Sequence, residues 1–332
     1  MENTLNQLIS ESRLPAVEAA LLQTFRSAAI DKIDLLSGGL SGSAVYKMIV
    51  QGRAYVLKLD APSIHDTHAL EETSKAGIAP RLYFREASAG ITITDFIESK
   101  PIRQVFTPEK LVSELANTIR SIHTLPCHIP GHDLQQTIDG MMNNFLQTKV
   151  LAGPIIEECF THYLAIKQKY PWDDPDKVFS HNDINPGNLL CDGVRLWVID
   201  WDAAFSNDKY IDLATAANFF VQTEEQEVEF LHIYFNGAVD EHKRARFYTM
   251  RQISRIIYGI LLVQVAVRNK PAGQQLDPEM EGKTLKAFGE KMAAGQLSMA
   301  TYEGQLMYGK AQMNEAVHQM RSSRFTRELW RL

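Results

Sequence analysis

The sequence predicts an α+β fold with two lobes, a small β-rich N-terminal lobe and a larger, mostly helical C-terminal lobe. Three observations lead to this prediction. Short β-rich runs with glycines at their joints fill residues 31–97, apolar residues at helical spacing dominate residues 98–332, and an island of short strands and turns interrupts these helices at residues 178–202. With 332 residues, 45% of them hydrophobic, the chain is long enough for two domains with a sizeable core.

Residues 1–30 are predicted to form an N-terminal helical extension. Apolar residues recur there at helical spacing, and Pro15 marks a break between two short helices. The pattern changes at residue 31, where the runs IDLL, SAVYKMIV and AYVLKL follow one another. These runs predict three strands, and residues 51–53 are expected to close a hairpin between the second and the third.

A helix is predicted next, over about residues 65–75. It is expected to end at Gly77, a glycine C-cap, and Pro80 prevents its continuation. The run LYFREASAGITITDFI then predicts a second hairpin, which turns around residues 88–90. The predicted order in this lobe is therefore strand, strand, strand, helix, strand, strand, and the lobe ends at residue 97.

The C-terminal lobe, residues 98–332, is predicted to be mainly helical. Helices are expected at residues 111–123, 141–151, 154–170, 211–221, 226–235 and 241–268. The island at residues 178–202 contains VFS, NLLC and RLWVID, which predict short strands joined by turns. The tail from Glu281 again shows helical spacing, and we expect it to pack on this lobe.

Composition excludes several classes of function. The net charge of -6 leaves no basic stripe for nucleic acid. The opening MENTLNQLISESRL does not resemble a secretory signal, and the apolar run at residues 256–267 is too short to span a bilayer. We therefore expect a cytoplasmic protein with neither a nucleic-acid nor a membrane partner. The three scattered cysteines, Cys127, Cys159 and Cys191, are interpreted as buried thiols.

The strongest indication of function is HNDINPGNLL, residues 181–190, followed by LWVIDWD, residues 196–202. In phosphoryl transfer from ATP, an Asp orients the acceptor hydroxyl and an Asn five positions later ligates magnesium, which is the spacing of Asp183 and Asn188. Asp200 ends an apolar run and is expected to add a second magnesium ligand. The plain alternative is that these side chains only cap turns and a strand.

A glycine-rich run, LLSGGLSGSAVYKM at residues 35–48, is predicted to cover the phosphates. Glycines such as Gly42 let the backbone approach phosphate oxygens, and Ser41 and Ser43 add hydroxyl donors. Lys58 stands downstream in the apolar run AYVLKL and is expected to bind the α- and β-phosphates. A hairpin turn without a ligand and a surface lysine on an edge strand are the alternatives.

These motifs resemble a family. GGLSG, VLKL, GIAPRLY, IHTLP, HNDINPGNLL and IDWDAAFSNDKYIDLA are together similar to the aminoglycoside phosphotransferase and choline kinase superfamily, nearest its bacterial choline and ethanolamine kinase-like branch. The resemblance covers roughly residues 33–265. It implies a protein-kinase-like fold that binds ATP and Mg²⁺ between its lobes, with Asp183 as the catalytic aspartate and with Asn188 and Asp200 as metal ligands.

The resemblance also implies roles for further residues. It matches Asp66 to the helix acid that pairs with Lys58, for which Glu71 and Glu72 are alternatives, and it matches Asp202 to an acidic position beside the acceptor. Adenine is implied to bind the backbone of a four-residue segment, Thr94, Asp95, Phe96 and Ile97.

The acceptor is expected to be a small molecule with a hydroxyl group. Asn182 replaces the Arg of the protein-kinase HRD motif, no APE sequence is present, and only eleven residues separate Asp200 from Asp212. The chain therefore has little room for the activation segment that docks a peptide.

Choline and ethanolamine are the leading acceptors. A quaternary ammonium is best bound by an aromatic cage, but the resemblance places Ala203 and Leu261 at two expected cage positions. An aromatic wall could be formed by Trp201, Phe205, Phe219, Phe220 and Tyr258, of which Phe219 and Phe220 are expected to be core residues. Asp202, together with Asp208 or Glu224, is available for a primary amine. The alternatives are an aminoglycoside, thiamine or ketosamine kinase, or a nucleotide-binding regulator without turnover. The sequence leaves open whether the chain forms a homodimer.

Overall fold

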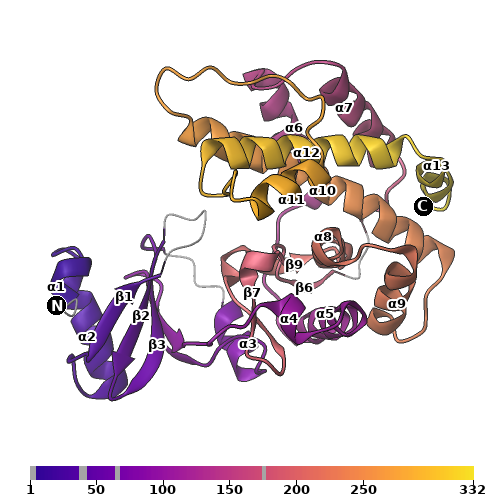
Figure 1. Cartoon of the computed structure of the whole chain (residues 1–332). Helices are drawn as coiled ribbons and strands as arrows, with labels where there is room; N and C mark the ends of the chain where they lie inside the picture. The colour runs from indigo at the N-terminus through magenta and orange to yellow at the C-terminus, as the bar shows by residue number, and fades with distance from the viewer. Residues whose placement is uncertain (1–4, 37–42, 64–67, 174–176) are drawn as a thin grey trace.

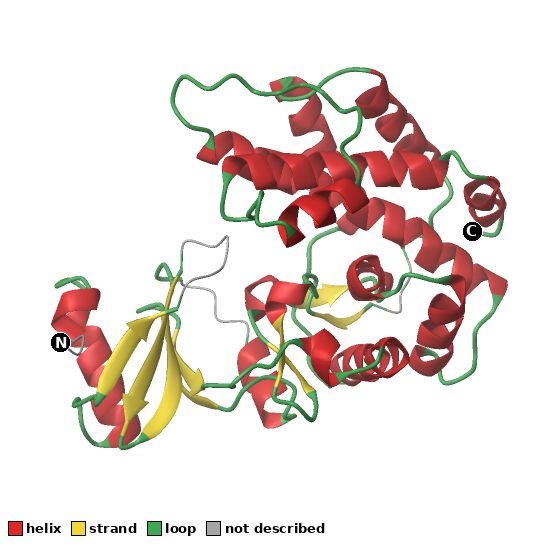
Figure 2. Ribbon diagram, viewed as in Figure 1, coloured by secondary structure: helices red, strands yellow, loops and turns green. Residues whose placement is uncertain are grey.

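The computed structural model describes residues 5–36, 43–63, 68–173 and 177–332. The predicted site residues Ser41, Gly42 and Asp66 lie outside these ranges. The described residues form a β-sheet N-terminal region and a helical C-terminal region (Figures 1 and 2). The α+β fold class predicted from the sequence is therefore confirmed, whereas the domain boundaries after residues 30 and 97 stay a prediction.

The N-terminal region is built on an antiparallel five-stranded sheet with the order β1-β2-β3-β5-β4. Its strands are β1 Lys32–Leu35, β2 Ala44–Val50, β3 Arg53–Leu59, β4 Leu82–Glu86 and β5 Ile91–Asp95. In the sequence, α1 Leu5–Leu8 and α2 Leu14–Phe25 precede the sheet, and α3 Ala69–Lys75 stands between β3 and β4. Pro15 stands in the first turn of α2, where its missing N–H would have had no helical partner.

The hairpin between β2 and β3 has the predicted turn at Gln51 and Gly52. Both residues have positive φ, 52° and 75°, as in the type I′ turns whose twist matches that of the flanking strands. The register that follows pairs Val45 with Lys58. The turn thereby fixes the height of Lys58 in the sheet.

Alternation along β3 separates a core face from a face that meets the C-terminal region. Leu57 is fully buried in a cluster that includes Val17 and Leu21 of α2. Lys58, one residue on, projects from the opposite face because successive strand side chains alternate. Burial of the apolar face against α2 therefore aims the lysine away from the core, as the sequence pattern predicts.

The C-terminal region surrounds the island of short strands with helices (Figure 2). Its helices are α4 Ile102–Val105, α5 Pro108–His123, α6 Leu134–Thr148, α7 Pro154–Lys167, α8 Tyr210–Phe220, α9 Glu224–Tyr234, α10 Glu241–Asn269, α11 Leu285–Ala293, α12 Tyr302–Met320 and α13 Ser323–Trp330. The island comprises β6 Val178–Ser180, the 3₁₀ turn η1 Pro186–Asn188, β7 Leu189–Cys191, β8 Leu196–Val198, the 3₁₀ turn η2 Trp201–Ala203 and β9 Phe205–Asn207. β6 pairs with β9, and β7 pairs with β8.

The C-terminal tail belongs to the core of this region. Helix α12 lies along α10 (Figure 1), and Gly259 and Gly309 permit their close contact. A Cβ atom on Gly309 would lie only 3.0 Å from the carbonyl oxygen of Gly259, so larger residues would force the helices apart. Helix α10 is long and apolar enough to cross a membrane, but 61% of its most apolar window is buried against other helices. The predicted packing of the tail is confirmed.

Several local predictions need correction. Helix α6 begins at Leu134 rather than at residue 141, because the Asp133 side chain caps it by accepting the backbone N–H of Gln136 at 2.8 Å. Strand β9 is an additional element of the island. Cys127 is half-buried, whereas Cys159 and Cys191 are buried as predicted.

Candidate active site

Asp212, in the first turn of α8, holds the start of the predicted catalytic loop. Its fully buried carboxylate accepts the backbone N–H groups of His181 at 2.8 Å and Asn182 at 2.7 Å. The imidazole of His123 in α5 contacts the same carboxylate, with 3.0 Å between His123 Nε2 and Asp212 Oδ2. Its other ring nitrogen, Nδ1, is 2.7 Å from the Tyr234 hydroxyl. The backbone at residues 181–182 is thus fixed from a distant part of the chain.

Asn182 extends this anchor toward η2 and β9. Its backbone has φ of 66°, a left-handed conformation that Asn tolerates better than most residues. The side chain donates to the carbonyl of Ala203 at 2.8 Å and accepts from Asn207 Nδ2 at 2.8 Å. The Asn that replaces the arginine of protein kinases therefore joins the loop to the turn that carries Asp202.

The loop presents Asp183 with its carboxylate already surrounded by donors. Asn185 Nδ2 donates to Oδ1 at 2.9 Å, and Asn188 Nδ2 donates to Oδ2 at 3.0 Å. The Tyr258 hydroxyl from α10 also donates to Oδ1. Burial, together with the charge of Asp183, raises the pKa of the Tyr258 phenol well above its ordinary value. The phenol therefore stays protonated at neutral pH and acts as the donor.

Asn188 and Asp200 lie on neighbouring backbone segments. The N–H of Ile199 donates to the carbonyl of Asn188 at 3.0 Å, which continues the pairing of β7 with β8. Asp200 follows with φ of 64° and ψ of 65°, so the chain turns sharply as it leaves the strand. The Asn and the Asp that the sequence assigns to magnesium are thus brought together.

Lys58 joins the sheet to the C-terminal region through carboxylates. Its ammonium lies 3.0 Å from Asp200 Oδ1, 2.6 Å from Asp202 Oδ2 and 3.4 Å from Asp60 Oδ1. Burial lowers the pKa of Lys58, but the negative charges of these carboxylates raise it by more, so the pKa lies above its ordinary value. Lys58 is therefore a fixed positive charge beside Asp200.

Asp202 also lines a cavity next to this cluster. The cavity has a volume of about 330 Å³ and lies between the end of β3, the hairpin that joins β4 to β5, and the turn η2, where Asp60, Arg85 and Thr92 contribute to its walls. Burial raises the pKa of the Asp202 carboxyl, but its hydrogen bond and ion pair with Lys58 have the larger effect. The pKa of Asp202 therefore lies below its ordinary value. A deprotonated carboxylate thus faces the cavity.

Trp201 does not lie where its predicted role requires. It is 4% exposed, and its ring stacks on Phe179 with 5.9 Å between centroids and contacts His181 edge-on at 4.7 Å. The indole packs inward because its Nε1 also donates to the carbonyl of Val198 at 3.0 Å. Trp201 is a core residue, and its ring faces are not available to an acceptor.

The segment predicted to bind adenine lies where the sheet meets the C-terminal region. Thr94 and Asp95 end β5, and the Asp95 carboxylate accepts from Arg53 Nη2 at 2.7 Å and from the Tyr83 hydroxyl at 3.0 Å. These two side chains hold the end of the strand in place.

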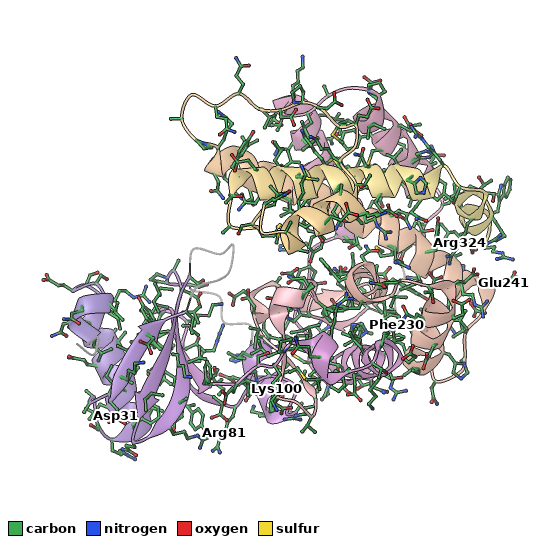
Figure 3. All side chains as sticks on the ribbon, viewed as in Figure 1. Asp31, Arg81, Lys100, Phe230, Glu241 and Arg324 are labelled. Carbon is green, nitrogen blue, oxygen red and sulfur yellow. The ribbon has the colours of Figure 1, made fainter. Side chains whose placement is uncertain are left out.

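The chain that follows is attached to both regions. The Phe96 ring lies under the ammonium of Lys47, with Nζ 4.0 Å from its centroid. Beyond Ile97, the backbone N–H of Lys100, which Figure 3 labels at this junction, donates to the carbonyl of Cys191 at 2.7 Å. At the opposite end of β3 and β5, Ser43 Oγ donates to Asp60 at 2.5 Å, so this predicted phosphate donor is held beside the carboxylate cluster.

Asp212, His123 and Asp60 were not predicted as site residues from the sequence. A charged residue between apolar neighbours in YIDLATA is the one signal that could have indicated a buried Asp212. Asp60 is two residues from Lys58 in the sequence, but its contact with the ammonium follows from how the chain leaves β3.

Replacing Asp212 with alanine is expected to lower the free energy of unfolding by about 2–5 kcal/mol, because the N–H groups of His181 and Asn182 would be buried without acceptors. Urea denaturation followed by circular dichroism measures the change. The control is Asp139→Ala. The Asp139 carboxylate accepts hydrogen bonds from the side chains of Tyr163 and Lys167, but it is 27% exposed, so water can replace it as the acceptor. Equal losses in the two variants would contradict the anchoring role.

Residues 32–248 match the sequence model of a family described as the phosphotransferase enzyme family. The match covers well over half of the chain. No curated protein matches the chain in sequence.

Solved structures with a similar fold include three kinases. A choline/ethanolamine kinase family protein from Mesorhizobium loti has a TM-score of 0.67 at 17% identity, with 96% of this chain and 98% of that chain covered. The choline kinase of Streptococcus pneumoniae has a TM-score of 0.61 at 16% identity, covering 92% and 98%. A spectinomycin phosphotransferase in complex with ADP and its antibiotic has a TM-score of 0.58 at 16% identity, covering 90% and 98%.

Proposed function

The chain belongs to the phosphotransferase enzyme family, and from this premise we propose that it transfers the γ-phosphoryl group of ATP to a hydroxyl group of choline, ethanolamine or a related amino alcohol. It is a small-molecule kinase with a kinase-like fold, and the superfamily resemblance found in the sequence is confirmed. One observation carries the proposal. Lys58 of the sheet contacts Asp200, while Asn188 is bonded both to the backbone beside Asp200 and to Asp183.

In the proposed reaction, Asp183 orients the acceptor hydroxyl and accepts its proton as the oxygen attacks the γ-phosphorus. Its neighbours support this role. Asn185 and Asn188 donate to different oxygens of the carboxylate, so the group is held in one orientation before the acceptor arrives. Such preorganisation lowers the cost of reaching the transition state.

Magnesium fits the residues present. Both hydrogen bonds of the Asn188 side chain, among the described residues, use Nδ2, which leaves its amide oxygen to ligate a cation beside the carboxylate of Asp200. One or two protein oxygens are the usual set for magnesium in kinases, because phosphates and water complete the shell. No cluster of three His, Cys, Asp or Glu side chains suited to a metal occurs in the described ranges. When bound, the ion would neutralise charge on the transferred phosphoryl group.

Lys58 is proposed to bind the α- and β-phosphates. The ammonium now forms ion pairs with Asp60, Asp200 and Asp202, and ATP with magnesium would replace part of this network with phosphate contacts. We propose that Ser43 beside Asp60 adds a donor, and that the backbone at residues 94–97 receives the adenine. The pairing of Lys58 with Asp66 stays a prediction.

An amino alcohol is proposed as acceptor because acid and aromatic groups are both near the loop. Asp202 supplies negative charge in the turn η2, which the Asn182 side chain joins to the loop by donating to the carbonyl of Ala203. Tyr258 packs edge-on against Phe219, with 5.8 Å between ring centroids. With Trp201 in the core, the aromatic wall is incomplete, which favours a primary amine over a quaternary ammonium. The acidic cluster also suits an aminoglycoside, the second candidate. We retain the predictions of a cytoplasmic protein without nucleic-acid or membrane partners, and a homodimer stays open.

The test is ADP formation from ATP and magnesium with choline, ethanolamine, thiamine, a fructosamine, spectinomycin and kanamycin as separate acceptors. Ethanolamine or choline is expected to give the highest kcat/KM, and the same assay without acceptor is the blank. A preference for spectinomycin or kanamycin would replace the amino alcohol by the second candidate. If the protein binds ATP but forms no ADP above the blank with any acceptor, the nucleotide-binding regulator would be favoured.

A further inference from the structure

The hydrogen bonds around Asp183 distinguish its two carboxylate oxygens. An ionised carboxylate has about four lone-pair positions, two on each oxygen. Oδ1 accepts from Asn185 Nδ2 at 2.9 Å and from the Tyr258 hydroxyl. Oδ2 accepts from Asn188 Nδ2 at 3.0 Å. The described contacts therefore fill Oδ1 and leave one position on Oδ2.

Tyr258 is itself held firmly. It precedes Gly259, where α10 and α12 are in close contact, so a shift of this turn would collide with the backbone of Gly309. On the other side, its ring contacts Phe219 of α8. Packing among α8, α10 and α12 thus holds the Tyr258 hydroxyl in place beside Asp183.

We propose that Tyr258 is a positioning residue whose hydroxyl, together with Asn185, occupies Asp183 Oδ1 and so leaves Oδ2 as the oxygen that accepts the acceptor's proton. The proposal rests on the proposed function. In the step, the acceptor O–H bond breaks and its proton moves to Oδ2. The acceptor oxygen forms a bond to the γ-phosphorus, and the bond from phosphorus to the bridging oxygen breaks, with its electron pair leaving on ADP. Tyr258 keeps its proton throughout.

This role differs from that of an aromatic wall, which uses only the ring. Tyr258→Phe keeps the ring and removes the hydroxyl. If the hydroxyl positions Asp183, kcat falls by about tenfold to a hundredfold, as expected for losing one hydrogen bond to a charged group, while KM for the acceptor and for ATP stays within twofold. If only the ring matters, Tyr258→Phe keeps the kcat of the wild type, and the proposal is overturned.

A matched control is available in α7. The Tyr163 hydroxyl donates to Asp139 Oδ1 at 2.9 Å, and its side chain is buried, so Tyr163→Phe also deletes a tyrosine–aspartate hydrogen bond but acts away from the loop. Its kcat is expected to match that of the wild type. A similar fall in kcat for both variants would show a general effect of losing a buried hydroxyl, and would overturn the positioning role.

A second measurement needs no acceptor and separates this proposal from the proposed function. In full-length protein with [¹³Cζ]tyrosine, the Tyr258 resonance is assigned as the one missing from Tyr258→Phe. Asp183→Asn is expected to shift that resonance and leave that of Tyr163 in place. An unmoved Tyr258 resonance would overturn the contact, whatever the kinetics. A shifted resonance, in a protein that phosphorylates nothing in the panel, would retain the contact and refute the amino-alcohol kinase.

Discussion

Asp183→Ala is expected to lower kcat by about 10²–10⁴-fold, the usual contribution of a positioned general base, while the Kd for ATP changes by less than about threefold. The methyl group cannot accept the acceptor's proton. ATP is held elsewhere in the proposed site, by Lys58 and by the backbone at residues 94–97, so its binding does not depend on this carboxylate. Single-turnover phosphorylation and calorimetric titration with ATP measure the two quantities separately.

Asp183→Asn sharpens the test. The amide retains the shape of the carboxylate and one acceptor oxygen for Asn188 or Tyr258, so the loop is expected to keep its fold. The unfolding midpoint should fall, because the new NH₂ group faces a donor where the carboxylate offered an oxygen. Activity should nevertheless stay near that of Asp183→Ala, because a neutral amide is a poor base. Turnover close to that of the wild type in either variant would remove Asp183 from the chemistry.

The arrangement of candidate site residues that are close in the sequence was predictable, whereas their catalytic roles stay a prediction. Asp183, Asn188 and Asp200 lie within eighteen residues, and their turn and strand contexts are local, so their arrangement could be predicted from the motif. The alternation of β3 likewise placed Lys58, since burial of Leu57 fixes the face on which its neighbour projects.

Contacts between distant parts of the chain were not predictable in this way. Asp212 reaches the backbone of His181 only because the first turn of α8 lies beside the residues that follow β6, and His123 contacts the same carboxylate from α5. Trp201 was predicted to form part of an aromatic wall for the acceptor, yet tertiary packing turned its ring into the core. Single-sequence patterns give the residue types of a site, whereas packing decides which of them face it.

Helix α3 shows the same limit for the division into regions. It was predicted as part of the N-terminal lobe, but Ala69 at its start and Ala79, four residues beyond its end, are buried in the apolar cluster of the C-terminal region. The carbonyl of Ile78 also accepts the N–H of Val198 at 3.0 Å. The helix therefore connects the sheet to the island that carries Asp200, a relation that position in the sequence does not reveal.

Asp200→Ala is expected to remove magnesium-dependent turnover, with a fall in kcat of at least about a hundredfold at saturating ATP, because the loss of a metal ligand withdraws several kcal/mol of transition-state stabilisation. Initial rates measured against magnesium concentration test this. Alanine is also strained at the positive φ of Asp200, so Asp200→Asn is the companion variant. Asparagine tolerates that backbone and offers only a neutral oxygen, so it should fold normally and require a higher magnesium concentration than the wild type.

The matched control for Asp200 is Asp202→Asn. Asp200 and Asp202 both form ion pairs with Lys58, at 3.0 Å and 2.6 Å. Each variant therefore removes one negatively charged partner of the Lys58 ammonium. Only Asp200 adjoins Asn188 through the backbone bond of Ile199. Asp202→Asn should therefore leave the magnesium dependence unchanged and raise KM for a cationic acceptor. If both variants shifted the magnesium dependence equally, neutralisation of Lys58, and not metal ligation, would explain the role of Asp200.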